Sequence, residues 1–180
     1  MALSVEVLPF GMAVIRDATH ADLSAVTALS NALIDTTTTT WTERHETVDE
    51  RRAWLRKQHE VGYPLLVAED ETGDLVGFAT FGDFRDITKW PGYRFVVEHT
   101  VHVRGDQQGT GVGRALMGEL FDRARRLGKT QMIAGIDGTN EGSIRFHERL
   151  GFVEVARMPS IGFKHNTWLD LVLMQRALVD

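Results

Sequence analysis

The chain has 180 residues, 43% of them hydrophobic, no cysteine, and a formal net charge of -5 at pH 7. This length suits one domain that buries its own core, whereas the missing cysteines exclude disulfides and thiol chemistry and the negative charge disfavours nucleic acid as a partner. No apolar run approaches the roughly 20 residues that cross a bilayer, and the first residues lack a secretory signal, so we expect a cytoplasmic protein without a membrane partner.

The first eighty residues are predicted to form a strand, two helices and a β-hairpin. Thr19 and Thr47 each begin a capping box, in which an acidic residue follows three positions later and apolar residues continue at helical spacing. The sequence Asp-Glu-Thr-Gly at residues 70–73 is typical of a hairpin turn. The predicted elements are a strand over residues 12–17, a helix that carries Leu23, Val26, Leu29 and Leu33, a helix from residue 47 through Leu55, and strands over residues 65–69 and 75–81.

Five threonines at residues 36–40 and then Trp41 lie between the two predicted helices. β-branched residues disfavour a long helix, so we expect a loop here. Its hydroxyl groups either face a ligand or belong to a plain polar connection, and the residues alone leave both alternatives open.

A long strand is predicted over residues 93–103, after a polar loop that contains Phe84, Arg85 and Trp90. Side chains alternate between the two faces of a strand. One face would carry Phe95, Val97, His99, Val101 and Val103, and the other Arg94, Val96, Glu98, Thr100 and His102. The first set belongs to a core, and the second is polar enough to border a cleft.

The remaining residues continue the alternation of helices and strands. A helical pattern runs from Gly111 to Gly128, and the basic residues within it, like Arg51 and Arg52 earlier, are expected on solvated helix faces. The later elements are a strand over residues 130–136, a turn over 137–140, a helix over 141–150 ended by Gly151, and strands over 152–156 and 168–176 with a polar loop between them. This order predicts a mixed α/β domain around one central sheet.

Glycines cluster where the long strand passes into the following helix. Gly109, Gly111 and Gly113 lack a Cβ atom, so backbone N–H groups can approach a ligand closely. The N-terminus of a helix attracts anions through its unpaired N–H groups and its dipole. The expected ligand is therefore a phosphate or pyrophosphate.

The spacing of these glycines distinguishes between cofactors. A P-loop is disfavoured because no Lys-Ser/Thr pair follows. A dinucleotide fingerprint would need Gly or Ala where Arg114 stands, although Asp137 keeps a nicotinamide-dependent oxidoreductase open as an alternative.

The segment Gln108-x-x-Gly111-x-Gly113 resembles the pyrophosphate loop of the GNAT N-acetyltransferases. The later segment from Asn140 to Phe152 is similar to a second motif of that family. Four further segments, at residues 77–85, 97–103 and 162–170 and at the threonines before Trp41, resemble the phosphinothricin and methionine sulfoximine N-acetyltransferase group. The resemblance implies a GNAT fold, with a mixed central sheet flanked by helices, in a single domain over residues 12–180 behind an N-terminal extension of residues 1–11.

This resemblance also implies a homodimer that transfers acetyl from acetyl-CoA, as co-substrate, to the α-amine of a small amino acid. The positions that correspond to cofactor-binding residues of the family are Val101, His102, Val103, Gln108, Gly109, Thr110, Gly111, Val112, Gly113, Arg114, Asn140 and Ser143. Backbone groups of Val101 and Val103 would pair with pantetheine.

Glu98 and His147 correspond to the catalytic residues of the group. The attacking amine must lose a proton at neutral pH, so a nearby carboxylate is the expected base; the alternative for Glu98 is an exposed strand position. His147 would act as the acid that protonates the CoA thiolate, the alternative being an ordinary histidine on a helix surface. No metal site is expected, because His99 and His102 fall on opposite faces of one strand.

Trp41, Phe84, Arg85 and Thr100 are the predicted substrate-binding residues. The planar guanidinium of Arg85 suits a carboxylate, phosphinate or sulfone oxygen, with a solvated loop arginine as the alternative. Trp41, Thr100 and His102 differ from the residues common in the group, which leaves phosphinothricin, methionine sulfoximine, methionine sulfone and other small amino acids open as acceptors. The competing class is a non-catalytic acyl-CoA sensor, which would keep the glycine loop without needing Glu98.

Overall fold

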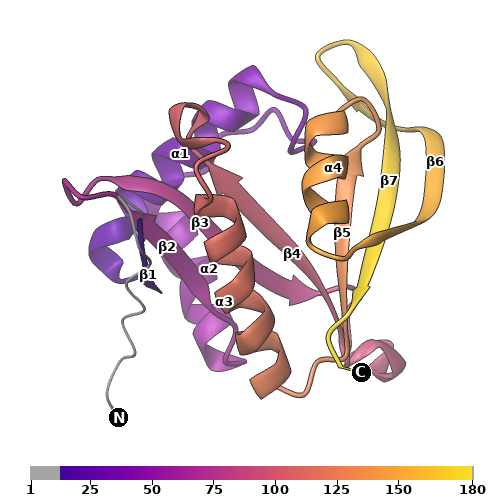
Figure 1. The fold of residues 1–180 in the computed structure, drawn as a ribbon, viewed down its shortest axis with the longest axis horizontal. Helices are drawn as coiled ribbons and strands as arrows, with labels where there is room; N and C mark the ends of the chain where they lie inside the picture. Colours follow the sequence, from indigo (N-terminus) through magenta and orange to yellow (C-terminus); the bar gives the residue numbers. More distant parts are fainter. Residues whose placement is uncertain (1–12, 180) are drawn as a thin grey trace. The chain divides into compact units, whose positions relative to one another are not determined.

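The computed structural model describes residues 13–179, and the predicted extension and the start of the first strand lie outside this range (Figure 1). Its contacts divide the chain into two units. The first unit comprises residues 13–30, 46–81 and 100–123, and the second comprises residues 31–45, 82–99 and 124–179. No helix among residues 13–179 is both long and apolar enough to cross a membrane.

Three antiparallel strands form the sheet of the first unit. β1 (Val14–Asp17) pairs with β2 (Leu65–Glu69), and β2 pairs with β3 (Leu75–Asp83). The predicted turn between β2 and β3 is confirmed. Its Asp70 carboxylate accepts the backbone N–H groups of Thr72 and Asp74, and Gly73 takes a φ of 86° that residues with a Cβ rarely adopt.

Both predicted capping boxes are present, and they fix where the first two helices begin. Thr19 caps a short 3₁₀ turn that leads into α1 (Leu23–Thr36), and Thr47 caps α2 (Val48–Glu60). In each box the threonine oxygen accepts a backbone N–H, and the acidic side chain accepts the N–H of the threonine.

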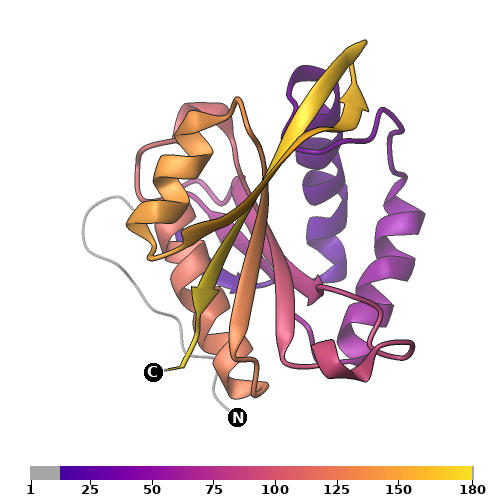
Figure 2. The same ribbon diagram turned by 90° about the vertical axis from the view of Figure 1, so that its right-hand side faces the viewer.

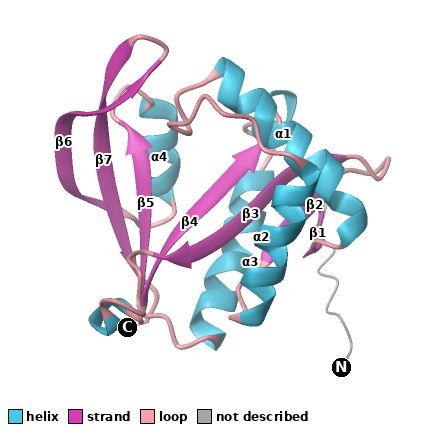
Figure 3. Ribbon diagram, turned by 180° about the vertical axis from the view of Figure 1, so that it is seen from behind, coloured by secondary structure: helices cyan, strands magenta, loops and turns pink. Residues whose placement is uncertain are grey.

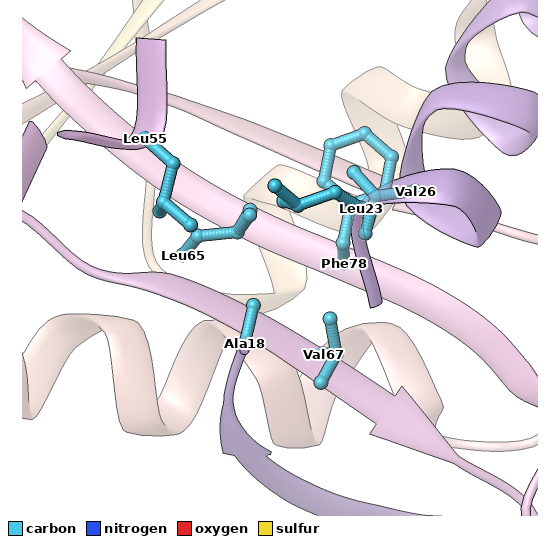
Figure 4. Packing of buried hydrophobic residues seen from close by; sticks show 7 residues of the cluster. All are labelled: Ala18, Leu23, Val26, Leu55, Leu65, Val67 and Phe78. Carbon is cyan, nitrogen blue, oxygen red and sulfur yellow. The ribbon is translucent and has the colours of Figure 1, made fainter. Parts of the chain in front are cut away.

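The core of the first unit lies between these helices and the strands. Figure 4 shows seven of its side chains: Ala18, Leu23, Val26, Leu55, Leu65, Val67 and Phe78. Phe78 of β3 faces this cluster, whereas its neighbour Gly77 faces the opposite side, toward Leu116 of α3 (Val112–Arg126). Helices α2 and α3 therefore cover opposite faces of the strands in this unit (Figures 1 and 2).

The strands of the second unit combine parallel and antiparallel pairing. β4 (Val96–Val103) pairs in parallel with β5 (Gln131–Asp137), and β5 pairs antiparallel with β7 (Thr167–Ala177), which pairs antiparallel with β6 (Val153–Lys164). Figure 3 shows α4 (Glu141–Arg149) beside β5. β4 contributes residues to both units. The order of the strands is β1-β2-β3-β4-β5-β7-β6, which confirms the predicted mixed sheet.

Two predicted boundaries and one predicted surface were wrong. Residues 91–93 form a 3₁₀ helix that begins at Pro91, so β4 starts at Val96. The predicted loop after residue 156 belongs mostly to β6, whose register shifts between Met158 and Gly162 and so breaks the alternation expected of a strand. Arg51 lies buried rather than solvated, because it pairs with Glu46 and covers aromatic rings.

Candidate active site

The glycine loop of the first unit has the geometry of an anion site. Gly109 and Gly111 have φ values of 78° and 100°, which confirms why glycine stands at these two positions. The carbonyl of Gly111 accepts the N–H of Ala115, so α3 begins directly after it. The first N–H groups of a helix have no acceptor within that helix. Gly113 lies inside the first turn and has no positive φ, so only its small size favours an approaching ligand.

The loop before α3 is held by its own hydrogen bonds. The Thr110 hydroxyl donates to the carbonyl of Gln107 over 2.7 Å, and the N–H of Arg104 donates to the carbonyl of Val76 over 2.8 Å. A loop that is already ordered loses less entropy when it binds an anion. The predicted phosphate loop therefore has a defined shape in the protein.

Glu98 extends from β4 over Gly135 of β5. Most of β5 is buried, but Gly135 is exposed. A Cβ atom on Gly135 would lie only 3.0 Å from Oε1 of Glu98, so the carboxylate occupies the space that a side chain would fill. Partial burial raises the pKa of Glu98 above its ordinary value, and the positive charge of Arg85 opposes that rise.

Phe84 and Arg85 are fixed beside the start of β4. The N–H of Phe84 donates to the carbonyl of Val96 over 3.3 Å, and its ring centroid lies 6.0 Å from that of Tyr93. The guanidinium of Arg85 lies 5.2 Å from the Phe84 ring and interacts electrostatically with Glu98. The fold thus gathers a carboxylate, a guanidinium and an aromatic ring that the sequence had predicted to act together.

The loop after α1 is anchored within the second unit by several side chains. The Thr38 hydroxyl donates to the Asp137 carboxylate, and the Lys164 ammonium donates to the carbonyls of Thr37 and Thr40 over 2.7 and 2.8 Å. The indole N–H of Trp41 donates to the Thr38 carbonyl over 3.0 Å. The hydroxyls of Thr37 and Thr38 donate to groups of the protein and so hold the loop in place. This role differs from both alternatives considered for the threonines, a ligand contact and a plain polar connection.

Residues on β5 relate this loop to Glu98. Gly135 and Asp137 are two positions apart, so they lie on the same face of the strand. The carboxylate of Glu98 covers Gly135, and Thr38 binds Asp137. Glu98 and the loop that carries Trp41 therefore border the same face of β5.

His147 is buried on α4, unlike the surface histidine considered as an alternative. Its Nδ1 lies 2.7 Å from the carbonyl oxygen of Ser143, so Nδ1 carries the proton of the neutral ring. Nε2 is buried with no hydrogen-bond partner among residues 13–179. Burial lowers the pKa of His147 despite the Ser143 carbonyl, which raises it. The role of His147 as an acid stays a prediction.

The other predicted cofactor residues occupy varied environments. Asn140 caps α4, since its Oδ1 accepts the N–H of Ser143 over 3.0 Å. The ring of His102 packs against Phe78, and burial together with the charge of Arg51 lowers the pKa of His102 to about 4. Its backbone is thus the part that can serve a cofactor. Thr100 is exposed on the same face of β4 as Glu98.

Sequence reasoning missed Gly135, and it placed Gly162 and Lys164 only in a segment similar to the family, without a role for either. A glycine inside a strand pattern often marks a close approach by another group, and that signal was available for Gly135. Asp137 had been weighed as a ribose ligand, but its carboxylate binds Thr38 and Thr139, which disfavours the nicotinamide alternative. No cluster of metal-binding side chains is found within residues 13–179.

Comparison with known proteins identifies the family of this fold and site. Residues 26–152 match the model of the acetyltransferase (GNAT) family, and the chain belongs to this family. The predicted fold and the predicted class of enzyme are thereby confirmed.

Individual relatives narrow the comparison. An L-methionine sulfoximine/L-methionine sulfone acetyltransferase of Salmonella typhimurium is 44% identical over 91% of this chain and 94% of its own length. A phosphinothricin N-acetyltransferase of Alcaligenes faecalis is 37% identical over 87% of this chain and 78% of its own. A solved structure of a putative acetyltransferase from Salmonella typhimurium with acetyl-CoA has a TM-score of 0.88 and 43% identity, covering 93% of this chain and 95% of that one.

Proposed function

We propose that this enzyme transfers acetyl from acetyl-CoA to the α-amine of a small amino acid of the methionine sulfoximine, methionine sulfone or phosphinothricin type. The observation that carries the proposal is the Glu98 carboxylate, which lies over the exposed Gly135 and interacts with Arg85. The names of the relatives support the acceptor class.

The cofactor would be held by the glycine loop, by β4 and by the start of two helices. Its pyrophosphate would accept N–H groups from the loop of Gln108 to Gly111 and from the first turn of α3, and its pantetheine would pair with the backbone of Val101 to Val103. Asn140 and Ser143, at the start of α4, are further candidates for contact with the CoA moiety.

Glu98 would act as the general base. It takes a proton from the α-ammonium group, directly or through water, and the free amine attacks the thioester carbonyl. A C–N bond forms, the C–S bond breaks, and CoA leaves as a thiolate while the attacking nitrogen gives its second proton to solvent. A raised pKa makes the Glu98 carboxylate a stronger base than an ordinary glutamate. A thiol has a pKa of about 8.5, so the thiolate can leave without the acid predicted at His147.

Arg85, Phe84, Trp41 and Thr100 would hold the acceptor. The Arg85 guanidinium suits an anionic or strongly polar oxygen, and its position near Glu98 keeps both within reach of one small molecule. The rings of Phe84 and Trp41 would cover the methylene groups between the polar ends of such an acceptor.

The first test is release of the CoA thiol from acetyl-CoA with phosphinothricin, methionine sulfoximine, methionine sulfone and the common amino acids. We expect turnover with one of the first three, and a fall in kcat of about 10² to 10⁴ in Glu98→Gln, the usual contribution of a positioned base. Glu148→Gln, an exposed change on α4, is the matched control. Binding of acetyl-CoA without turnover on any acceptor would favour the sensor alternative.

We also propose that the enzyme is a homodimer that works in the cytoplasm, where acetyl-CoA is supplied. The support for a dimer is an apolar surface on the last hairpin, where Ile161, Phe163 and Trp168 are each more than half exposed and the ring centroids of Phe163 and Trp168 lie 5.2 Å apart. Sedimentation of the native chain and of Phe163→Glu tests this; a dimer that the change dissociates is expected, and a wild-type monomer would contradict it.

A further inference from the structure

Trp41 is seated on β6 at a position where only glycine fits. A Cβ atom built on Gly162 would fall 2.2, 2.3 and 2.9 Å from three atoms of the Trp41 indole. These distances are far below any real carbon contact, so another residue at position 162 would displace the ring. Trp41 is half-buried, which leaves part of the ring open to a ligand.

Lys164 lies two positions further along β6 and binds the loop that carries Trp41. Gly162 and Lys164 together are called the seat of Trp41. Residues 162 and 164 lie on the same face of the strand, and Phe163 points the other way. The Lys164 side chain is only 1% exposed, yet its ammonium donates to the carbonyls of Thr37 and Thr40. A buried charge is costly unless it is hydrogen-bonded, so these carbonyls and the ammonium stabilise one arrangement of the loop.

Two further contacts complete the anchoring of residues 37–43. The Glu43 carboxylate accepts the N–H of His165 over 2.8 Å, and Thr38 binds Asp137. Asp137 shares a face of β5 with Gly135, over which Glu98 lies. The seat of Trp41 is therefore built from β6 but borders the same face of β5 as the proposed base.

We propose that Gly162 and Lys164 are positioning residues that hold Trp41 as a wall of the acceptor site and thereby determine which acceptor side chains are accepted. The inference rests on the proposed function and extends it to residues that do not touch the substrate. Gly162, Lys164 and Trp41 are not among the residues proposed to hold the cofactor, so the effect of the seat should fall on the acceptor and not on acetyl-CoA.

Kinetics of Gly162→Ala test the proposal, with Gly118→Ala as a matched control because a Cβ there has no neighbour within 4 Å. We expect Gly162→Ala to raise the KM of the preferred acceptor at least tenfold and to leave the KM of acetyl-CoA within twofold. In a Trp41→Ala background the same change should alter the acceptor KM by less than twofold, since the displaced ring is already absent. Equal effects in the two backgrounds would overturn the proposal.

A second variant separates the seat from general folding. Lys164→Met keeps the length of the side chain but leaves the carbonyls of Thr37 and Thr40 without the ammonium. We expect the same selective rise in acceptor KM in enzyme that still melts cooperatively. A loss of kcat with both KM values unchanged would contradict a positioning role.

The outcome for the seat can be read independently of activity. With 5-fluorotryptophan incorporated, the Trp41 resonance is assigned by its loss in Trp41→Phe, and its chemical shift should move in Gly162→Ala but not in Gly118→Ala. A wild type without turnover would refute the proposed function alone. An unmoved resonance would refute the seat, and a moved resonance with unchanged acceptor KM would refute its role in specificity.

Discussion

At the scale of single residues, two glycines of the site leave space that neighbouring side chains occupy. Gly135 leaves space for the Glu98 carboxylate, and Gly162 leaves space for the Trp41 ring. Both glycines lie in strands, where glycine is disfavoured by its conformational entropy. Their presence is explained by the large or charged side chain that lies against each of them.

Gly135→Ala should reduce catalysis more than stability. The added Cβ would meet Oε1 of Glu98 at 3.0 Å, and the exposed carboxylate can give way by a few tenths of an ångström. Small misplacements of a catalytic group cost up to about 10²-fold in rate. We expect kcat to fall about 5- to 50-fold with little change in the melting temperature. A fall in melting temperature that matches the loss of activity would instead indicate a packing defect.

His147→Phe should leave most of the activity in place. The neutral imidazole already donates its proton to the Ser143 carbonyl, and phenylalanine preserves the ring that packs against His99 and Phe152. We expect kcat within about fivefold of the wild type and an unchanged pH profile. If His147 protonated the thiolate, kcat would fall by about 10² to 10⁴ and the alkaline limb of the profile would change.

At the scale of elements, β3 is held between neighbours through a third glycine. A Cβ on Gly77 would lie 2.8 Å from the backbone oxygen of His102 and 3.2 Å from Leu116 of α3. A backbone oxygen in a sheet cannot move aside as the end of a flexible side chain can. The strand therefore requires glycine where it meets β4 and α3 closely.

Two alanine substitutions in β3 should separate this packing effect from the intrinsic effect of alanine in a strand. Gly77→Ala should lower the free energy of unfolding by about 1 to 3 kcal/mol, as overpacking does. In Gly82→Ala the new Cβ has no neighbour within 4 Å, so the free energy should change by less than about 1 kcal/mol. Urea denaturation of both variants measures the difference, and equal midpoints would refute the packing argument.

At the scale of the whole molecule, a half-buried histidine links stability to pH. His102 has a pKa of about 4 in the folded chain, against an ordinary value of 6.5, because of burial and the charge of Arg51. This depression corresponds to about 3 kcal/mol. The unfolded chain takes up a proton near pH 6.5 and the folded chain only near pH 4. Stability is therefore complete above pH 6.5 and is lost as the pH falls toward 4.

His102→Phe should weaken this acid dependence. Between pH 7.5 and pH 5.0 the wild type should lose about 2 kcal/mol more than the variant, because the phenylalanine ring has no proton to gain. Urea denaturation at the two pH values gives the comparison, with His20→Gln as an exposed control that should behave as the wild type. Equal losses in the wild type and in His102→Phe would contradict the depressed pKa.

The residues by themselves determined the elements whose signals are local. Thr19 and Thr47 fixed the starts of helices, Gly109 and Gly111 marked the turn before α3, and the alternation around Glu98 placed that carboxylate on a polar strand face. Each of these features rests on contacts or conformations within a few residues, which a pattern in the sequence records.

Only the tertiary structure decided how distant segments meet. Gly162 lies against the Trp41 ring and Lys164 binds the loop that carries it, each from more than a hundred residues away. The buried environments of His147 and Arg51 arise from the packing of other elements. The two register shifts in β6 concealed that strand, because extra residues interrupt the period-two pattern. Contacts between distant segments determine which residues are buried. Burial in turn determines the tautomer of His147, the pairing of Arg51 and the position of the Trp41 ring, so local patterns in the sequence could not predict them.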